Sequence, residues 1–283
     1  MLYKHIAVLV TCYNRKETTL NFLTSLYQQK LSDTIYLDVY LVDDGSTDGT
    51  SQAIKMQFPN VLIIRGNGNL FWGGGMHLAW TEATKKNYDA YLWLNDDTLL
   101  LPDAITTLLV TASELNKNEA YAGIVIGTCF EPESGSPTCG GRLKKSKNVL
   151  TPSAHPQQCD LMNGNIVLIP GYIHKVVGNI SPVFRHLGGD NDYGLRAIKA
   201  GFKLWVAPGY LGVCESHSYT PWADPAIPLI ARWRFLHDPK GQPPYEVYVY
   251  ARRHSGFFWP IDLIKLYFRV IFPRLYNVIK QFA

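Results

Sequence analysis

Two pairs of adjacent carboxylates in this sequence each follow a run of apolar residues. The pairs are Asp43 with Asp44, and Asp96 with Asp97. Apolar runs that stop at polar residues are typical of buried parallel strands, and ligands of open α/β sheets bind at the edge where such strands end. A carboxylate is a strong acceptor for the imide N–H of uracil or thymine, and adjacent carboxylates can hold a divalent cation against a diphosphate. The pattern therefore predicts a nucleotide pocket at one edge of a sheet.

The elements that must position these carboxylates alternate along the chain. The residue pattern predicts strands near 5–11, 37–42, 60–64 and 90–95, and helices near 16–29, 48–57 and 75–86. Such alternation implies right-handed crossovers and a mainly parallel α/β sheet. With 283 residues and 47% hydrophobic content, the chain is long enough for one large domain. We expect that domain over residues 1–220 and a separate extension over residues 221–283.

The ends of the first two predicted strands carry longer motifs. The first strand ends in Thr11-Cys12-Tyr13-Asn14, and the second ends in Val42-Asp43-Asp44-Gly45-Ser46. These segments resemble the T-x-Y-N and V-D-D-G-S-x-D-x-T motifs of family 2 glycosyltransferases. The resemblance implies the GT-A nucleotide-diphospho-sugar transferase fold, with a mixed, mostly parallel sheet flanked by helices and, here, a C-terminal helical extension.

The same resemblance assigns residues to the nucleotide. It implies that Tyr13 packs on the nucleobase, that Asp43 or Asp44 bonds the pyrimidine imide, and that the remaining contacts come from Thr11, Asn14 and Arg15. The alternative is that residues 44–49 form only a turn followed by a helix cap.

A glycine-rich segment, residues 66–76, leads into the predicted helix at 75–86. It is not a dinucleotide fingerprint, because Phe71 stands where the third glycine should be, and it carries no P-loop lysine. It resembles the glycine-rich loop of family 2 enzymes, especially rhamnosyltransferases, in which small residues such as Gly74 let the backbone approach the donor. The alternative is a flexible turn before the helix.

The triplet Asn95-Asp96-Asp97 corresponds to the D-x-D motif of the family, with asparagine at its first position. The resemblance implies that Asp97 binds Mn²⁺ or Mg²⁺ and that Asn95 and Asp96 support the ribose or the metal. Such a cation would neutralise the departing pyrophosphate oxygens. His217, after the last predicted strand, would complete the metal site, although a lone histidine is more often structural. Otherwise, the two carboxylates only cap the following helix.

Residues 188–202 resemble the family segment E-D-x-D-L-x-x-R-x-x-x-A-G, with Gly189 in place of the usual glutamate. In inverting members, the aspartate at the position of Asp190 is the base. It takes the proton from the acceptor hydroxyl as that oxygen attacks the anomeric carbon. Asp192 is the second candidate, and the alternative for both aspartates is capping of a helix predicted at 192–200.

The segment after Pro221 is basic and rich in aromatic residues. Between Ile261 and Lys280, polar residues fall on one helical face and apolar residues on the other, which predicts an amphipathic helix. Its charges are too many for a membrane-spanning helix, and Pro273 should kink or divide it. We expect the helix to lie on an anionic membrane. The alternative is packing against the first domain or another copy.

Charge and cysteine content narrow the class of protein. The net charge is +4, but the segment after Val249 contains six basic residues and one acidic residue. The rest of the chain is therefore close to neutral, and we expect no nucleic-acid binding. Five scattered cysteines without C-x-x-C spacing indicate a reducing compartment. Because the first predicted strand follows Met1 so closely, we expect no signal peptide.

Together with the resemblance, these motifs predict an inverting, metal-dependent glycosyltransferase, cytoplasmic and peripheral at the inner face of the plasma membrane. It would transfer a sugar from a dTDP- or UDP-sugar, with dTDP-rhamnose as one candidate, to a hydroxyl of a cell-surface glycan or polyprenyl-linked oligosaccharide. The alternative is a noncatalytic, membrane-tethered module that binds a nucleotide-sugar or a glycan. A nucleotide-dependent oxidoreductase is excluded, because Tyr13-Asn14-Arg15-Lys16 supplies no dinucleotide fingerprint after the first strand.

Overall fold

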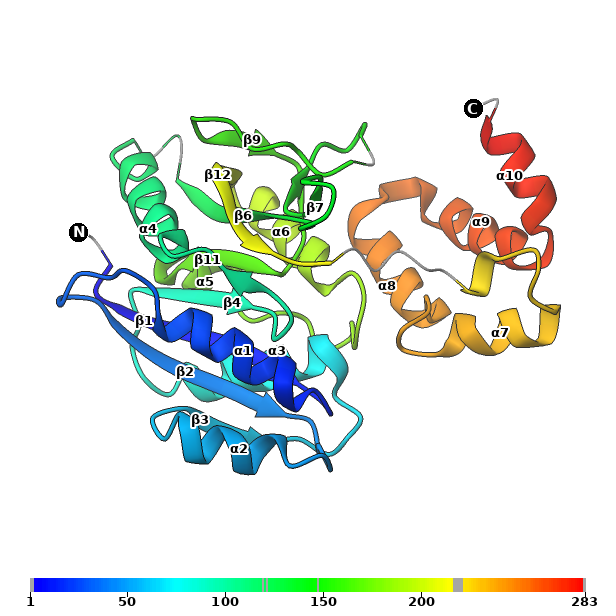
Figure 1. Ribbon diagram of the computed structural model, residues 1–283. Coiled ribbons are helices and arrows are strands. Elements are labelled where there is room, and N and C mark those ends of the chain that lie inside the picture. The colour runs from blue at the N-terminus through cyan, green and yellow to red at the C-terminus, as the bar shows by residue number, and fades with distance from the viewer. Residues whose placement is uncertain (1–2, 119, 121, 147, 216–220, 282–283) are drawn as a thin grey trace. The chain divides into compact units, whose positions relative to one another are not determined.

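The computed structural model describes residues 3–118, 120, 122–146, 148–215 and 221–281. The chain forms two compact units (Figure 1). The first comprises Met1–Pro182 and Asp190–Ser216, and the second comprises Val183–Gly189 and His217–Ala283.

A mixed, mostly parallel sheet runs through the first unit. In spatial order its strands are β3 (Leu62–Arg65), β2 (Tyr36–Asp43), β1 (His5–Cys12), β4 (Ala90–Leu94), β11 (Ile166–Pro170), β6 (Gly123–Phe130), β12 (Lys203–Val213) and β5 (Leu99–Leu100). The pairs among β3, β2, β1 and β4 are parallel, as is the pair β6 with β12. β11 is antiparallel to both its neighbours, and β5 is antiparallel to β12. The prediction of a mixed, mostly parallel sheet is therefore confirmed.

Short strands pair with β6 and β12 or with each other in the first unit. β7 (Pro137–Cys139) pairs with β6, and β9 (Gln157–Cys159) pairs with β12. A separate small sheet joins β8 (Gly141–Arg142) to β10 (Leu161–Met162).

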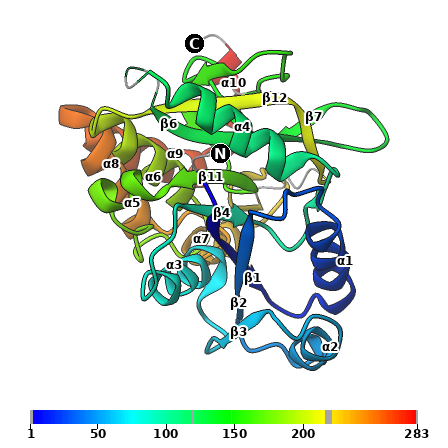
Figure 2. The ribbon, with the colours of Figure 1, turned by 90° about the vertical axis from the view of Figure 1, so that its left-hand side faces the viewer.

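Helices cover both faces of the large sheet. The core on one face includes residues of α1 (Lys16–Tyr27), α2 (Thr50–Gln57) and α4 (Ala104–Leu115). The core on the other includes residues of α3 (Phe71–Ala83), α5 (Gly171–Val177) and α6 (Gly189–Lys199). Figure 2 shows α1 and α2 on one side of β1 and β2, with α3, α5 and α6 on the other. Because side chains alternate along a strand, Val8 of β1 enters the first core and Leu9 the second.

A cluster of buried aromatic rings joins the elements that lead to the candidate site. Trp80 of α3, Trp93 of β4 and Tyr193 of α6 are fully buried. The ring centroids of Trp80 and Trp93 are 5.3 Å apart, and Tyr193 lies 5.2 Å from each of them. Tilted and edge-to-face rings at such distances contribute beyond their buried area. The cluster therefore fixes the relative positions of α3, β4 and α6.

α3 begins earlier than the sequence indicated. The helix starts at Phe71 instead of residue 75, so Gly73–Gly75 lie in its first turns rather than in a loop. The first N–H groups of a helix have no partner inside the helix. Here Asp44 accepts the N–H groups of Leu70 and Phe71, which allows the helix to begin at this point.

α6 also begins earlier than predicted. It starts at Gly189 rather than at residue 192. Asp190 and Asp192 therefore both lie in its first turn, where the helix dipole favours carboxylates.

The second unit is a small helical assembly. Its helices are α7 (Leu229–His237), α8 (Pro244–His254), α9 (Trp259–Ile271) and α10 (Pro273–Gln281). Trp222, Leu236, Leu266 and Val270 form its core. Pro273 begins α10, so the predicted division of the tail helix at this proline is confirmed. Within the described ranges, every helix is too short or too polar to cross a membrane.

Candidate active site

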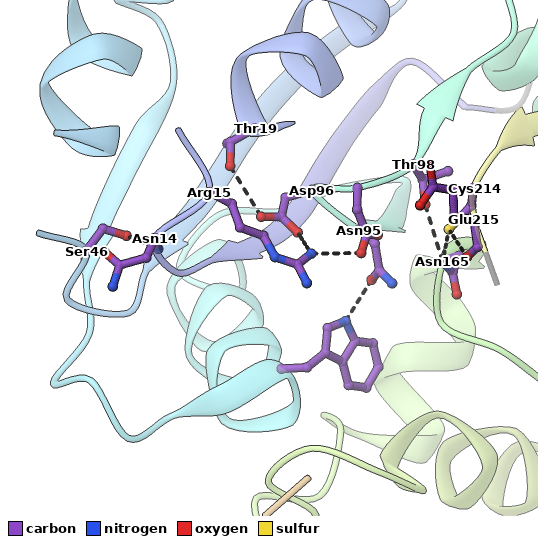
Figure 3. A network of polar contacts seen from close by, with 12 residues as sticks. Asn14, Arg15, Thr19, Ser46, Asn95, Asp96, Thr98, Asn165, Cys214 and Glu215 are labelled. Atoms are coloured by element: carbon purple, nitrogen blue, oxygen red, sulfur yellow. Dashed lines mark hydrogen bonds and ion pairs between the residues drawn. The ribbon is translucent and has the colours of Figure 1, made fainter. Parts of the chain in front are cut away.

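The loops after β1 and β2 are tied together at the carboxyl edge of the sheet. Cys12 at the end of β1 pairs with Asp43 at the end of β2. Beyond them, the N–H of Asn14 donates to Ser46 Oγ at 2.8 Å, and Figure 3 shows these two residues. Asn14 Oδ1 accepts the N–H of Thr47 at 2.8 Å. Asn14 has a left-handed φ of 49°, a conformation that asparagine adopts more readily than most residues. Asn14, a predicted nucleotide contact, thus also joins the two motif loops.

Asp44 holds the glycine-rich segment in place. Its Oδ1 accepts the N–H of Gly68 at 2.8 Å, and its Oδ2 accepts those of Leu70 at 2.9 Å and Phe71 at 3.0 Å. The residue is 4% exposed. Hydrogen bonds to an ionised acceptor are stronger than neutral ones, so three of them make a firm anchor. A carboxylate can accept about four hydrogen bonds, which leaves Asp44 one further site.

Asp43 is engaged in a similar way but with fewer donors. Its Oδ1 accepts the N–H of Ser46 at 2.8 Å, and its Oδ2 accepts the hydroxyl of Ser51. Tyr13, the predicted partner of the nucleobase, is 53% exposed and presents a ring surface at this edge.

The alternative interpretation of residues 44–49, a turn followed by a helix cap, also describes part of this loop. Asp48 Oδ1 accepts the N–H of Thr50 at the start of α2.

The glycines of the loop are required by close packing. A Cβ atom on Gly75 would lie 2.2 Å from Thr11 Oγ1, and one on Gly66 would lie 2.5 Å from Asp44 Oδ1. Gly74 belongs to the first turn of α3, where its N–H donates to the Leu70 carbonyl at 3.1 Å. Thr11 thus lies beneath the helix start, which carries the residues predicted to approach the donor.

The Arg15 guanidinium lies on the two carboxylates that follow β4. Its Nη1 is 2.8 Å from Asp97 Oδ2. The same nitrogen is 3.2 Å from Asp96 Oδ1, a contact drawn in Figure 3. Thr19 Oγ1 donates to the other oxygen of Asp96 at 3.2 Å. Burial raises the pKa of the Asp96 carboxyl to about 6, although the positive charge of Arg15 lowers it. Asp96 and Asp97 therefore lie together, and an internal cation is bound to both.

Trp72 connects the Asn95-Asp96-Asp97 triplet to the candidate base. Trp72 Nε1 donates to Asn95 Oδ1 at 2.8 Å. Its ring lies on Gly164, where a Cβ atom would be only 2.4 Å from Trp72 Cζ2. The N–H of Gly164 in turn donates to Asp190 Oδ2 at 3.1 Å. A single indole ring thus spans the interval between Asn95 and the backbone that binds Asp190.

The two candidate bases have different surroundings. Asp190 is half-buried, accepts N–H groups from Gly164 and Asn191, and has its pKa raised by burial. Asp192 is fully buried and forms an ion pair with Arg196 at 2.9 Å. Arg196 also donates to two backbone carbonyls. This arrangement gives Asp192 a structural role and leaves Asp190 as the more accessible carboxylate.

The donor set fits a hard divalent cation. Asp97 Oδ1 is buried and has no hydrogen-bond partner within the described part of the chain. No group of three His, Cys, Asp or Glu side chains suited to a metal occurs among the described residues, and His217 lies outside them. Mg²⁺ and Mn²⁺ need no such cage, because one or two carboxylates with substrate phosphates and water suffice for Mg²⁺. The oxygen ligands of Asp96 and Asp97 are of the kind that both ions prefer.

Sequence reasoning assigned no individual contact to Trp72, Gly164 or Thr19. Trp72 lies within the glycine-rich segment that was predicted to approach the donor, and this position could have indicated its role in the site. Gly164 stands in the short loop before β11, and nothing local to it indicates a contact with Trp72. Thr19 faces inward from α1, and its contact with Asp96 follows only from the fold.

Comparison with known proteins yields one family and several similar folds. The model of the family described as "Glycosyl transferase family 2" matches residues 7–152. Similar solved structures include S. aureus TarS, with a TM-score of 0.52 and 12% identity over 89% of this chain and 44% of TarS. GalNAc-T7 with UDP, GalNAc and Mn²⁺ has a TM-score of 0.60 and 15% identity over 91% of this chain and 53% of GalNAc-T7.

A third similar structure is the mannosyltransferase PcManGT from Pyrobaculum calidifontis in complex with GDP-Man and Mn²⁺. Its TM-score is 0.53, with 17% identity over 93% of this chain and 73% of PcManGT. The chain spans about half the length of the first two structures. No curated protein matches the chain by sequence.

At these identities the structural likenesses establish the fold alone, which is GT-A, as the sequence predicted. The family match covers just over half of the chain and includes the motifs at β1, β2 and β4. The chain belongs to glycosyl transferase family 2.

Proposed function

We propose that the protein is an inverting glycosyltransferase that uses Asp190 as its base and a dTDP- or UDP-sugar as its donor. The observation that carries this proposal is the contact chain through Trp72. It links Asn95, beside the two carboxylates suited to a metal–diphosphate, to Gly164 and hence to Asp190. A sugar transferase needs a donor diphosphate site and a base close to each other, because the sugar is attacked while it leaves the diphosphate.

Asp190 acts on the acceptor in this proposal. Its carboxylate takes the proton of the acceptor hydroxyl as that oxygen bonds to the anomeric carbon and the nucleoside diphosphate departs. A pKa raised by burial makes the ionised carboxylate a stronger base than an exposed aspartate. Asp192 is the weaker candidate, because Arg196 holds its buried charge.

The donor assignment rests on the β1 and β2 loops. Asp43 and Asp44 present oxygens that can accept the imide N–H of uracil or thymine, and exposed Tyr13 offers a ring for stacking. Of the similar structures, GalNAc-T7 was solved with UDP and PcManGT with GDP-Man, which supports a nucleotide-sugar donor here. dTDP-rhamnose is the sugar donor that the glycine-rich loop with Gly74 favours by resemblance.

A divalent ion belongs to the same proposal. Asp97, with Asp96 beside it, would hold Mn²⁺ or Mg²⁺, and His217 is the further ligand that the family resemblance supplies. When bound, the ion neutralises the charge of the leaving diphosphate.

The second unit fits a peripheral role at the inner face of the plasma membrane, with a glycan or polyprenyl-linked oligosaccharide as the acceptor. Phe257 is 99% exposed and Phe258 71%, just before α9, and Ile264 within α9 is 66% exposed. Exposed Arg252 and Lys265 are close to them in sequence. Large exposed apolar side chains mixed with basic ones suit the interface of an anionic membrane. We keep the division into a catalytic domain at 1–220 and an extension at 221–283 as part of this proposal.

The test of the base is Asp190→Asn. We expect turnover to fall by about 10²- to 10⁴-fold, with unchanged affinity for UDP or dTDP in a thermal-shift titration with Mn²⁺. Asp103→Asn is the matched control, because its side chain is 66% exposed and the charge change is the same. If Asp190→Asn keeps full turnover, Asp190 is not the base. If the protein binds the nucleotide but transfers no sugar in any form, the noncatalytic module replaces this proposal.

A further inference from the structure

Arg15 forms ion pairs with the two carboxylates that the proposed donor site needs for its metal. The guanidinium contacts both Asp97 and Asp96, at 2.8 and 3.2 Å, while its own side chain remains 46% exposed. The side chains of Asp96 and Asp97 are 8% and 23% exposed. The cation therefore lies on a carboxylate pair in which Asp96 is buried and Asp97 is partly exposed.

The backbone presents Arg15 at this point for structural reasons. Arg15 is the residue before the first turn of α1, and its carbonyl accepts the N–H of Thr19 at 2.8 Å. The preceding residue, Asn14, is bonded to Ser46 and Thr47 of the β2 loop. The main chain at Arg15 is thus held on both sides, whereas its half-exposed side chain has room to turn.

Asp96 and Asp97 differ in how many of their carboxylate oxygens accept a hydrogen bond. Both oxygens of Asp96 have donors, one from Arg15 and one from Thr19. Within the described ranges, Asp97 has only the Arg15 contact, on Oδ2, and its buried Oδ1 has no hydrogen-bond partner. Leaving a buried carboxylate oxygen unsatisfied is costly. Asp97 is therefore the carboxylate that gains most from a second cation.

We propose that Arg15 is an exchangeable internal cation, which holds Asp97 while the donor site is empty and moves to the donor diphosphate when the metal arrives. This inference rests on the proposed function. One guanidinium on two carboxylates leaves one negative charge. A divalent ion added beside that guanidinium makes the cluster positive and repulsive, and a diphosphate restores the balance. Arg15 is also suited to the diphosphate, because its planar fork binds phosphate oxygens in pairs.

The consequence is coupling between the metal and the nucleotide. The free protein should bind Mn²⁺ weakly, because Arg15 competes for Asp97. Once UDP or dTDP offers its diphosphate, Arg15 has a new partner, Asp97 is released, and both ligands bind more tightly. By linkage, each ligand must raise the affinity for the other by the same factor.

The experiment is a Mn²⁺ titration followed by electron paramagnetic resonance, with and without saturating UDP or dTDP. It uses the whole chain and compares Arg15→Gln with Lys16→Gln. Lys16 is the matched control, because its side chain is 43% exposed, carries the same charge, and places its ammonium nitrogen 3.9 Å from a carboxylate oxygen of Glu17. Arg15→Lys keeps the charge but loses the fork.

We expect Arg15→Gln to tighten Mn²⁺ binding to the nucleotide-free protein by about 5- to 10-fold, the worth of a half-exposed ion pair with a strong hydrogen bond. It should also weaken nucleotide binding in the presence of Mn²⁺, so that the coupling between the ligands shrinks. Lys16→Gln should change neither, and Arg15→Lys should lie between wild type and Arg15→Gln.

The outcomes separate this inference from the proposal beneath it. If Arg15→Gln binds Mn²⁺ no more tightly than wild type while nucleotide still promotes Mn²⁺ binding, the exchange is wrong and the metal-dependent donor site stands. If no variant binds Mn²⁺ even with nucleotide, the proposed metal site itself fails. If Lys16→Gln tightens Mn²⁺ binding equally, the effect is general electrostatics and the assignment to Arg15 is overturned.

Discussion

Substitution of Gly164 by alanine should disturb the proposed base, Asp190, without changing the Asp190 side chain itself. The added Cβ would lie 2.4 Å from Trp72 Cζ2, 2.7 Å from its Cη2 and 3.5 Å from Asp190 Cβ. Ordinary contact begins at 3.4 Å, so the two groups must separate by about 1 Å. The indole cannot bend, and Trp93 lies against it with ring centroids 6.0 Å apart.

The required movement has two costs. If Trp72 retreats, its 2.8 Å hydrogen bond to Asn95 lengthens beyond the usual range, at a cost of about 1 kcal/mol. If the loop retreats instead, the N–H that binds Asp190 moves with it, and a 1 Å misplacement of a catalytic group can cost about 10²-fold in rate. We therefore expect kcat/KM to fall about 10- to 100-fold and the free energy of unfolding to fall by about 1–3 kcal/mol.

The assay combines steady-state transfer kinetics with urea unfolding, applied to Gly164→Ala, Trp72→Phe and the double variant. Phenylalanine lacks the atoms that the new methyl group meets, so the double variant should lose little more than Trp72→Phe alone. That is an interaction energy of about 0.5–3 kcal/mol in the cycle. Strictly additive losses, or a Gly164→Ala protein with unchanged kinetics and stability, would refute the role given to the contact between Trp72 and Gly164.

The remaining predictions concern pH and the membrane. Asp190 and Asp96 both have raised pKa values in the free protein, that of Asp96 to about 6. Both should be ionised for function, so kcat/KM should decline as pH falls below about 6, whereas an acid limb centred near the usual aspartate value of about 3.9 would contradict the burial argument. Replacing Phe257 and Phe258 with serine should lower binding to anionic vesicles by about tenfold or more in co-sedimentation, because each buried phenyl ring is worth about 1.5 kcal/mol or more. Met56→Ser, at an 84% exposed apolar residue of the first unit, is the control, and equal losses from both would count against membrane docking by the second unit.

The sequence predicted well what depends on local patterning. The apolar runs that end at Asp43 and at Asn95 became β2 and β4, because a buried strand needs a continuous apolar stretch and stops where polar side chains meet solvent. The grouping of Asp96 with Asp97 followed from adjacency alone. Alternation predicted a mainly parallel α/β sheet, and the resemblance of the motifs to family 2 glycosyltransferases implied its mixed character and the GT-A fold.

What sequence could not show depends on contacts between distant segments. The start of α3 at Phe71 follows from Asp44, a residue of another loop, so local helix signals placed it too late. Asp190 and Asp192 occupy the same helix turn and look alike in sequence. Only the packing of α6, which encloses Asp192 with Arg196, distinguishes them.

The glycine-rich segment is best understood as the part that makes the site a single unit. Asp44 fixes its start through three N–H groups, and Trp72 extends from it to Asn95 on one side and to Gly164 on the other. Side chains at Gly66 or Gly75 would collide with Asp44 or with the residue beneath α3. The glycines are therefore needed for the close approach that sets Trp72 between the triplet and the proposed base. A substitution at Asp44 should consequently alter the position of Asp190, although no hydrogen bond joins the two among the described residues.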